Sequence, residues 1–419
     1  METQNAIDTF IRETGSRVGS QLEACTRCGM CAEACHFYQA TGVPEYAPVW
    51  KFELLRKAYE QRFTLGGKIK LALGIDKRVT EEELKEWSSY VYHACTMCNK
   101  CALVCPMGID IAHLIADVRA GMVAANVVPS DLEEAVQKQL KEGSPLGVTD
   151  DVFEDRLDFV MDEWEVDIPV DKEDADTLVV FSSIEIMKFP QNLAAITKIL
   201  NAAGENWTLS SKAREVVNFG LYEGSRAHTK LILKRLLDGA AELGVKKIVV
   251  TECGHAYDAL RWTSYNLLDV PPDLEITHIV GLIGEYLESG RIKLKEKAFN
   301  EGTITFHDAC KIQRNGGHIE EPRKVMKIVA PDSFKEMTPN KEGAICCGGG
   351  GGVIAIKDAD PLRYDVFQLK MDQIKEVGAD TVVMACSNCR LQFTDCVGHF
   401  DLDLKVAGFA QMVADALEN

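Results

Sequence analysis

Two short cysteine runs in the first third of the chain have the spacing of iron–sulfur ligands. Each run reads CxxCxxCxxxC, and Pro106 follows the second run, as in bacterial ferredoxins that hold two clusters. Three cysteines of a tight loop reach three irons of one cubane, so the fourth cysteine points at the other cubane. We therefore predict crossed ligation of two [4Fe–4S] clusters, termed A and B. Cluster A would be held by Cys25, Cys28, Cys31 and Cys105, and cluster B by Cys95, Cys98, Cys101 and Cys35.

The alternative interpretation of these runs is structural zinc, which favours separate CxxC pairs over a run of four cysteines. The first run departs from the ferredoxin pattern only in having His36 where proline would follow. The chain contains fifteen cysteines, an odd number, and its N-terminus lacks the basic and apolar regions of a signal peptide. These features favour thiolate ligands in a reducing compartment over disulfides, so we expect a cytoplasmic protein.

A second set of cysteines lies in the last third of the chain. It consists of Cys310, the adjacent pair Cys346 and Cys347, and the pair Cys386 and Cys389. Adjacent cysteines can both reach one polynuclear site, and the five glycines that follow the pair let the backbone approach closely and offer N–H groups. Five converging thiolates exceed the four ligands of tetrahedral zinc. A phosphate-binding loop is disfavoured because no Lys-Ser/Thr follows the glycines.

The hydrophobic pattern predicts two different architectures. Residues 1–125 contain few β-branched runs and predict a helical ferredoxin domain, in which Thr80 and Glu83 form a capping box. Residues 126–172 predict an acidic helical linker. From residue 173 onward, buried strands alternate with amphipathic helices, which predicts a mostly parallel sheet covered by helices. The clearest strands span 177–181, 247–251, 303–306 and 381–385, and the clearest helices span 229–243 and 363–377.

The second architecture contains a faint internal repeat. Cys253 and Cys386 each follow a strand, a helix and a glycine-containing turn, which predicts a duplicated α/β unit with halves at 173–295 and 296–419. The predicted fold class is α + α/β, with an N-terminal α-helical two-[4Fe–4S] ferredoxin domain followed by a duplicated α/β cysteine-rich domain. Parallel sheets place sites at the carboxyl ends of their strands. We therefore expect the later cysteines to converge there, at the surface between the halves.

The spacing of the later cysteines also resembles the motif of a known protein family. The pattern Cys310-x35-Cys346-Cys347-x38-Cys386-x2-Cys389 resembles the CCG cysteine-rich domain of heterodisulfide reductase catalytic subunits. The segment 306–314 is similar to that family's HDxCxxxR motif. With the ferredoxin runs included, nearly the whole chain resembles the HdrD-like subunits of membrane redox complexes. Segments 252–255 and 316–323 are similar to the DsrK- and TmcB-type subunits of sulfate-reducing prokaryotes.

The resemblance implies a third, catalytic iron–sulfur cluster of the noncubane [4Fe–4S] type. Heterodisulfide reductases carry two complete CCG motifs, but the first half here retains only Cys253. Ala256 stands where the next cysteine would be, and Val216 and Val217 occupy the place of the adjacent pair. One such cluster is therefore expected. Its candidate ligands and catalytic residues are Cys310, Cys346, Cys347, Cys386 and Cys389.

Four polar side chains beside these cysteines are candidates for moving protons or holding a substrate. His307 and Arg314 are the candidate catalytic residues, and Asp308 and His255 are further candidates. The alternatives are that His307 and Asp308 cap the strand end and that Arg314 pairs with an acid. Cys396 fits a buried thiol better than a sixth ligand.

Composition limits the function. The net charge of −18 argues against a nucleic-acid partner and against adhesion to anionic lipid. No apolar stretch is long enough to predict a membrane span. The absence of CxxCH and of GxGxxG after a first strand predicts no haem and no flavin in this chain.

The resemblance implies a cytoplasmic oxidoreductase subunit, held on the inner face of the membrane by a cytochrome b-type subunit and other redox subunits. Electrons would pass between a quinone-linked haem and a disulfide or trisulfide, which a small protein could carry. Two alternatives stay open. The chain could be a pure electron-transfer module, or the iron–sulfur subunit of a flavoprotein complex of the glycerol-3-phosphate or glycolate dehydrogenase type.

Overall fold

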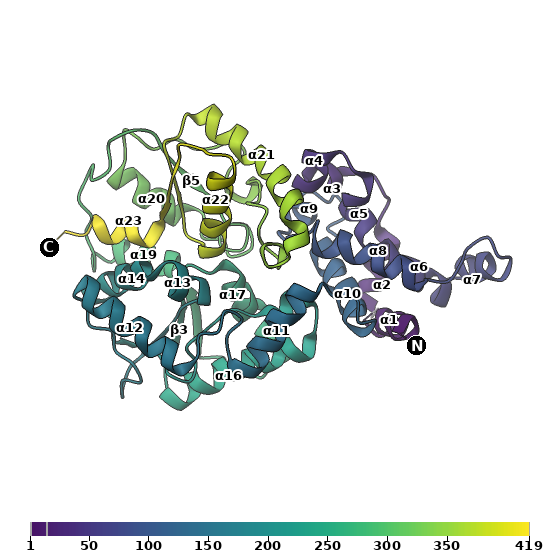
Figure 1. The fold of residues 1–419 in the computed structure, drawn as a ribbon, viewed down its shortest axis with the longest axis horizontal. Coiled ribbons are helices and arrows are strands. Elements are labelled where there is room, and N and C mark those ends of the chain that lie inside the picture. Colours follow the sequence, from purple (N-terminus) through teal and green to yellow (C-terminus); the bar gives the residue numbers. More distant parts are fainter. Residues whose placement is uncertain (1, 14–15, 419) are drawn as a thin grey trace. The chain divides into compact units, whose positions relative to one another are not determined.

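The chain folds into two compact units, drawn in Figure 1. The computed structural model describes residues 2–13 and 16–418. Unit 1 comprises Met1–Glu134, Gly220–Arg226 and Gly348–Leu369. Unit 2 comprises Ala135–Phe219, Ala227–Cys347 and Lys370–Asn419. Unit 1 is therefore discontinuous, because two later segments belong to it.

Unit 1 is helical throughout the part that the structure describes. The expected capping box is confirmed, since the Thr80 side chain accepts from the Glu83 amide and the Glu83 side chain accepts from the Thr80 amide. The packing is tight where Phe10 lies against Gly121, because a Cβ on Gly121 would stand 2.0 Å from a ring carbon. The helices of the N-terminal segment are α1 (Glu2–Glu13), α2 (Ser16–Ala24), α3 (Met30–Ala34), α4 (His36–Thr41), α5 (Pro48–Lys51), α6 (Glu53–Phe63), α7 (Leu65–Ala72), α8 (Glu81–Tyr92), α9 (Lys100–Leu103) and α10 (Ile111–Ala124).

Unit 2 contains two parallel sheets with the strand orders β2-β1-β3-β4 and β5-β6-β7. The four strands expected from sequence are present within a residue of their predicted ends, and three further strands join them. The strands are β1 (Thr177–Val180), β2 (Trp207–Thr208), β3 (Lys247–Val250), β4 (Glu275–His278), β5 (Ile304–His307), β6 (Thr381–Met384) and β7 (Lys405–Gly408). The central strands β1, β3 and β6 are almost wholly buried and rich in valine, as expected for sheets covered on both faces.

Helices connect the strands of unit 2. Two long helices match the predicted segments, namely α16 (Arg226–Leu243) and α21 (Asp360–Val377), although α21 begins in unit 1. The remaining helices are α11 (Ser130–Glu142), α12 (Asp150–Trp164), α13 (Ser183–Lys188), α14 (Pro190–Ala202), α15 (Phe219–Glu223), α17 (Gly254–Asp258), α18 (Ser264–Leu267), α19 (Ile279–Glu288), α20 (Glu320–Val329), α22 (Ser387–His399) and α23 (Phe409–Asp415). Within the described residues, none of the helices combines the length and apolarity needed to cross a bilayer.

Three buried carboxyl groups, those of Glu185, Glu215 and Glu252, lie beyond the carboxyl ends of β1 and β3. The Glu185 carboxylate accepts hydrogen bonds from Ser182, Thr251 and Asn192 side chains at 2.7–2.8 Å. Glu215 accepts from the Val217 amide at 2.8 Å. These contacts order the loops at the strand ends of the first sheet.

Burial gives Glu215 a pH-dependent effect on stability. Burial raises its pKa from 4.5 to about 8. The folded protein therefore holds a proton that the unfolded chain releases, so this contribution is complete below pH 4.5 and is lost as the pH rises through about 8. We expect Glu215→Gln to reduce the loss of unfolding free energy between pH 5.5 and pH 8, measured by anaerobic urea unfolding. The exposed control Glu285→Gln should retain the wild-type slope, and an equal slope in Glu215→Gln would contradict the assignment.

Candidate metal centres

The two ferredoxin-type loops share one unusual backbone conformation. In the first loop Arg27 and Gly29 have φ of 56° and 84°, and in the second Met97 and Asn99 have φ of 53° and 66°. Alternation of left- and right-handed residues curls a loop and turns successive N–H groups toward one centre, which suits an anionic group. Left-handed backbone at arginine and methionine is strained and persists where the surroundings or function require it. Both loops therefore have the backbone that a cluster would need.

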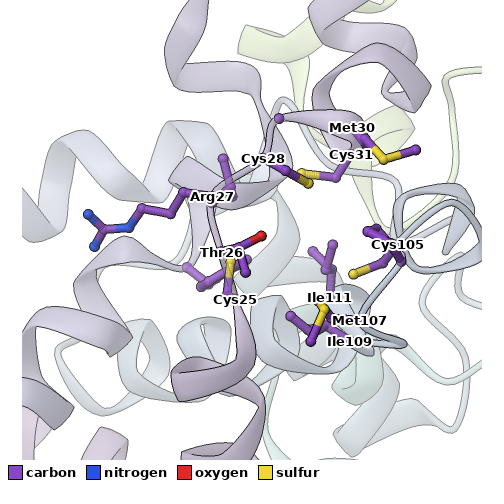
Figure 2. A pocket seen from close by; sticks show the side chains of 14 residues that line it. Cys25, Thr26, Arg27, Cys28, Met30, Cys31, Cys105, Met107, Ile109 and Ile111 are labelled. Carbon is purple, nitrogen blue, oxygen red and sulfur yellow. The ribbon is translucent and has the colours of Figure 1, made fainter.

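The first pocket is drawn in Figure 2. Three of its sulfurs come from the first cysteine run and one from the second, and its other walls are mainly apolar, including Phe52 and Ile111. The four cysteines that line it are Cys25, Cys28, Cys31 and Cys105. This is the set predicted from spacing for cluster A.

The second pocket contains the complementary set of sulfurs. Its cysteines are Cys35, Cys95, Cys98 and Cys101. The structure thus exchanges the fourth cysteine of each run between the two pockets, as crossed ligation requires. The ligation itself stays a prediction.

A buried lysine distinguishes the second pocket from the first. Lys51 is 1% exposed, and its Nζ lies 3.8 Å from the Cys35 Sγ. The ammonium also donates to the Ala94 carbonyl and stands 5.3 Å from the centre of the Phe37 ring. The arginine at the first pocket, Arg27, is instead half-exposed and pairs with Glu53 at 2.7 Å.

A second buried cation, Arg119, joins the Cys95 loop to other segments of unit 1. Its guanidinium is fully buried and donates to the carbonyls of Cys95 and Gly351, each at 2.8 Å. It also donates to the carbonyls of Val91 at 2.7 Å and Tyr222 at 2.6 Å. No carboxylate within the described residues forms an ion pair with it. Burial lowers the pKa of Arg119, and the charge of Cys95 is the largest influence in the opposite direction.

The glycine run after the cysteine pair packs against the Cys95 loop. Gly351 has φ of 63°, and a Cβ there would lie 2.6 Å from the carbonyl carbon of Thr96. Gly348 and Gly352 also have positive φ, at 94° and 90°. Glycine is therefore required at Gly351 both by its backbone conformation and by the close approach of Thr96.

The third site lies in unit 2, at the carboxyl ends of β5 and β6. The Sγ atoms of Cys347 and Cys389 and a ring nitrogen of His307 all lie within 4.8 Å of one another. His307 is fully buried, and neither of its ring nitrogens has a hydrogen-bond partner among the described residues. Burial, with the charge of Lys370 next, holds its pKa well below the ordinary value. A neutral imidazole in this position can ligate iron or donate to a cluster sulfur.

Cys386 completes the compact part of this site. A hydrogen bond from the Cys389 thiol lowers the pKa of Cys386, and backbone amides including that of Gly254 add to the effect. Cys346, Cys347, Cys386 and Cys389 are all buried, whereas Cys310 is half-exposed. The site is therefore more enclosed than the surface position that we expected.

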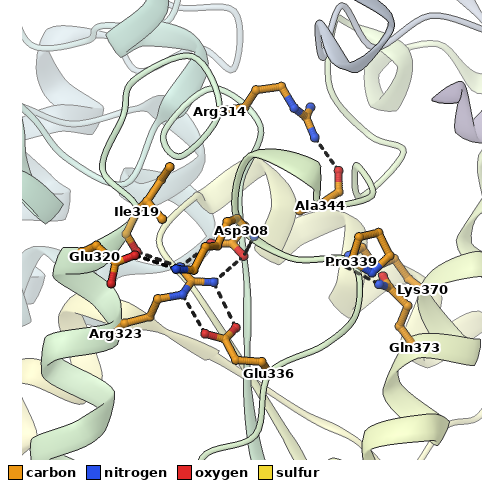
Figure 3. A network of polar contacts seen from close by, with 11 residues as sticks. Asp308, Arg314, Ile319, Glu320, Arg323, Glu336, Pro339, Ala344, Lys370 and Gln373 are labelled. Carbon is orange, nitrogen blue, oxygen red and sulfur yellow. Dashed lines mark hydrogen bonds and ion pairs between the residues drawn. The ribbon is translucent and has the colours of Figure 1, made fainter. Parts of the chain in front are cut away.

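The polar residues around the third site have structural partners (Figure 3). Asp308 forms a two-pronged ion pair with Arg323, at 2.9 and 2.8 Å. Arg314 donates to the carbonyls of Glu342, at 2.6 Å, and Ala344, just before the cysteine pair. Arg314 therefore tethers that segment through its backbone.

A buried lysine, Lys370, also lies near the cysteines of the third site. Lys370 is 1% exposed, and its Nζ donates to Gln373 Oε1 at 2.8 Å. Burial lowers its pKa to about 8, while the charges of Asp308 and of the cysteines favour its protonated form.

Three further candidates, His255, Cys396 and Cys253, are all buried. His255 is buried, and its Nε2 bonds to the Asn218 carbonyl at 2.7 Å. Cys396 is fully buried, with Gln392 donating to its sulfur at 3.2 Å. Cys253 is buried close enough to Cys386 for the charge of that thiolate to raise its pKa, although burial raises it more.

Comparison with known proteins agrees with this geometry. Residues 21–109 match the family described as a 4Fe-4S dicluster domain, and residues 304–394 match the cysteine-rich domain CCG. The chain is similar to heterodisulfide-reductase-like iron–sulfur subunits over most of its length. It is 26% identical to Hdr-like menaquinol oxidoreductase iron-sulfur subunit 2 of Archaeoglobus fulgidus, over 94% of this chain and 80% of that protein.

Two further relatives extend the comparison. A subunit of the dihydromethanophenazine:CoB–CoM heterodisulfide reductase of Methanosarcina barkeri is 28% identical, over 95% of this chain and 94% of that protein. The EtfAB:quinone oxidoreductase of Syntrophomonas wolfei is 24% identical, over 95% of this chain and 58% of that protein. The matches to a 4Fe-4S dicluster domain and to the cysteine-rich domain CCG support [4Fe–4S] clusters as the cofactors of this chain.

Three residues of these sites have no signal in the sequence. Lys51, Arg119 and Lys370 lie on ordinary helical segments, among many exposed lysines and arginines. Only the fold shows that each is buried beside cysteines. An alignment showing that these positions never vary would have been the signal to find them.

The close approach of Gly351 to Thr96 predicts a selective substitution effect. Gly351→Ala should lower stability by about 1–3 kcal/mol through overlap with the Thr96 backbone, in addition to left-handed strain. Gly74→Ala is a matched control, because Gly74 has φ of 66° and a Cβ there would meet nothing within 4 Å. Thermal unfolding and iron content of the anaerobic proteins would be compared. Equal losses in the two variants would show that the Thr96 contact is unimportant.

Proposed function

We propose that the chain is the electron-transfer iron–sulfur subunit of a membrane-associated oxidoreductase complex. Electrons would pass between a cytochrome b or quinone-linked partner and a disulfide or trisulfide at the CCG site, with clusters A and B between them. The chain would lie in the cytoplasm, on the inner face of the membrane. The relatives named as menaquinol and heterodisulfide oxidoreductase subunits support this assignment.

The observation that carries the proposal is the grouping of thirteen cysteines into three sets. Two sets of four line two pockets of unit 1. In unit 2, Cys347 and Cys389 lie beside His307, and Cys386 lies beside Cys389. Two crossed cubanes would share ligand segments and so stand close enough for electron transfer. The proposed ligands of the third cluster are Cys310, Cys346, Cys347, Cys386 and Cys389.

The exposure of side chains beside clusters A and B suggests the order in which electrons pass through them. Cys28 is exposed, and two methionines that line the first pocket, Met30 and Met107, are 47% and 50% exposed. A redox partner would therefore exchange electrons at cluster A. The second pocket is more enclosed, since Cys35 and Cys95 are both buried. Arg119 connects the Cys95 loop to Gly351, which follows Cys347 by four residues in the chain. Cluster B would then pass electrons on to the third site.

At the third site, reduction of a disulfide consumes two electrons and two protons and releases two thiols. A noncubane cluster would supply the redox chemistry when bound. We infer that His307 ligates or hydrogen-bonds this group, that the Lys370 ammonium balances thiolate charge, and that Arg314 positions the cysteine pair through the segment before it. The half-exposed Cys310 marks the side open to a substrate sulfur.

We also infer that the first sheet is a degenerate copy of the second. Both consist of a parallel core in which β1–β3–β4 corresponds to β5–β6–β7. Ser183 stands where Cys310 would be, and Cys253 stands where Cys386 would be. The degenerate half would then support the surviving site, since the Gly254 amide points at Cys386.

A second candidate function is electron transfer to or from a flavoprotein, without sulfur chemistry. The similarity to an EtfAB:quinone oxidoreductase favours it. In that case the third cluster would relay electrons, and no disulfide would be reduced by the reconstituted complex.

The function predicts the effect of removing one ligand of the third site. Cys347→Ser should abolish the electron paramagnetic resonance signal of the third cluster and the disulfide-linked activity. The signals of clusters A and B should persist, because their ligands lie in the other unit. Iron and sulfide content would be measured on the same anaerobic samples.

Cys396→Ser is the matched control, since a serine there can still accept from Gln392. It should keep all three clusters. A full iron complement and an unchanged spectrum in Cys347→Ser would refute the third site. Absence of disulfide reduction in the unchanged complex, with loss of electron transfer to the flavoprotein in Cys347→Ser, would favour the relay function.

Lys51 predicts a difference between the two cubanes. A buried cation favours the more negative, reduced state of a nearby cluster, so Lys51→Met should lower the reduction potential of cluster B and leave cluster A unchanged. Redox titration followed by electron paramagnetic resonance would measure both potentials. Lys51→Arg should retain most of the potential, and Lys57→Met should have no effect because Lys57 pairs with Glu83 outside both pockets. An unshifted potential in Lys51→Met at full iron content would contradict this role.

A further inference from the structure

Unit 1 carries a basic and apolar projection that lines neither cysteine pocket. Helix α7 lies at the outer end of α6, away from the other helices of unit 1 (Figure 1). Large apolar side chains cover it and its flanks, with 49–75% of each exposed. They are Phe63, Leu65, Ile69, Leu73 and Ile75. An exposed apolar cluster of this density marks a binding surface.

The backbone explains why these side chains face outward. Helix α7 packs on α6 through Gly67, where a Cβ would stand 2.2 Å from the Glu60 carbonyl oxygen. Leu65, Ile69 and Leu73 follow at intervals of four residues and so form one stripe on the opposite side. The glycine face is therefore committed to α6, and the apolar stripe is left without a partner among the described residues.

The projection is built as a rigid element. Thr64 caps α7 by accepting from the Gly67 amide at 3.0 Å. The Gln61 side chain donates to Asp76 at 2.8 Å and to the Lys77 carbonyl at 2.9 Å, which ties the far end of the projection back to α6. The exposed stripe is thus held in place and is not the product of a frayed end.

Cations surround the apolar stripe. Residues 62–78 carry five cations and one acid, in a chain whose net charge is −18. All five cations are exposed, and none forms an ion pair with another residue in the part of the chain that the structure describes. They are Arg62, Lys68, Lys70, Lys77 and Arg78. At 3.6 residues per turn, Lys68 and Lys70 fall about 100° to either side of the stripe.

We propose that this projection docks directly on an anionic lipid surface, with the apolar stripe at the level of the acyl chains and the lysines among the headgroups. Apolar side chains flanked by lysines on both sides are the pattern of a helix lying in a membrane interface. The opposite charge of anionic headgroups accounts for unpaired cations that a purely apolar protein partner would leave unused. This role does not depend on the proposed electron transfer.

The negative charge of the rest of the chain does not prevent docking. Helix α6 has eleven residues and is therefore about 16 Å long, roughly two Debye lengths at physiological salt. Repulsion from charges beyond that distance is largely screened. The acids at the start of α8 are partly neutralised because Glu81 pairs with Lys85 and Glu83 with Lys57. The local positive charge therefore determines whether this segment binds anionic lipid. The expectation drawn from the net charge of the chain does not apply to it.

The experiment is sedimentation of the purified, cluster-loaded chain with vesicles. Vesicles of phosphatidylcholine with about one third phosphatidylglycerol should bind it, and pure phosphatidylcholine vesicles should bind it much less. Lys68→Gln/Lys70→Gln should weaken binding to the anionic vesicles about thirtyfold, or roughly fivefold per cation. Leu65→Ser/Leu73→Ser should also weaken it. Iron content would confirm that each variant is folded, and it reports on the clusters independently of vesicle binding.

A matched control comes from α16, where Lys230 and Lys234 are exposed lysines on another helix. Lys230→Gln/Lys234→Gln should bind as the unchanged chain does. Equal binding to neutral and anionic vesicles, or equal losses in the two lysine variants, would overturn the proposal. So would binding only to vesicles that contain the membrane subunits of the complex, since the projection would then dock on protein.

Discussion

A single guanidinium organises unit 1. Arg119 is buried without a carboxylate partner in the described structure, and it donates to four carbonyls in three segments that are separated in the sequence. Such a charge is costly in a protein interior unless it is compensated. The largest opposing influence on its pKa is the charge of the Cys95 thiolate. Ligation of a cluster by Cys95 would supply that charge, which would couple metal loading to the folding of unit 1.

The same logic recurs at each of the more enclosed sulfur sites, with a different cation. Lys51 approaches Cys35, and Lys370 lies among the cysteines of the third site. A cluster with its thiolates is a compact anion, and a nearby buried cation lowers the cost of enclosing it. The cysteines and the cations are therefore buried together, because each lowers the cost of burying the other.

The sequence was most informative where covalent spacing restricts geometry. The two cysteine runs predict which sulfurs share a pocket, because loop length limits which atoms a cubane can reach. The Thr80 capping box and the valine-rich strands were also predictable, since both are local. Strands β4 and β7 were missed because their sequences, EITH and KVAG, lack the uninterrupted run of branched apolar residues that marks β3, KIVV. Lys51, Arg119 and Lys370 were missed because a burial partner distant in sequence leaves no local mark.

The discontinuity of unit 1 bears on how the protein is made. Its glycine segment, Gly348–Leu369, lies more than two hundred residues after the Cys95 loop against which Gly351 packs. A ribosome must therefore synthesise most of the chain before this part of unit 1 can close. Until then Thr96 lacks its contact with Gly351, and Arg119 lacks one of its carbonyl acceptors. Iron delivery to the second pocket before release from the ribosome would therefore meet a Cys95 loop without these supports, whereas delivery afterwards would meet the completed loop.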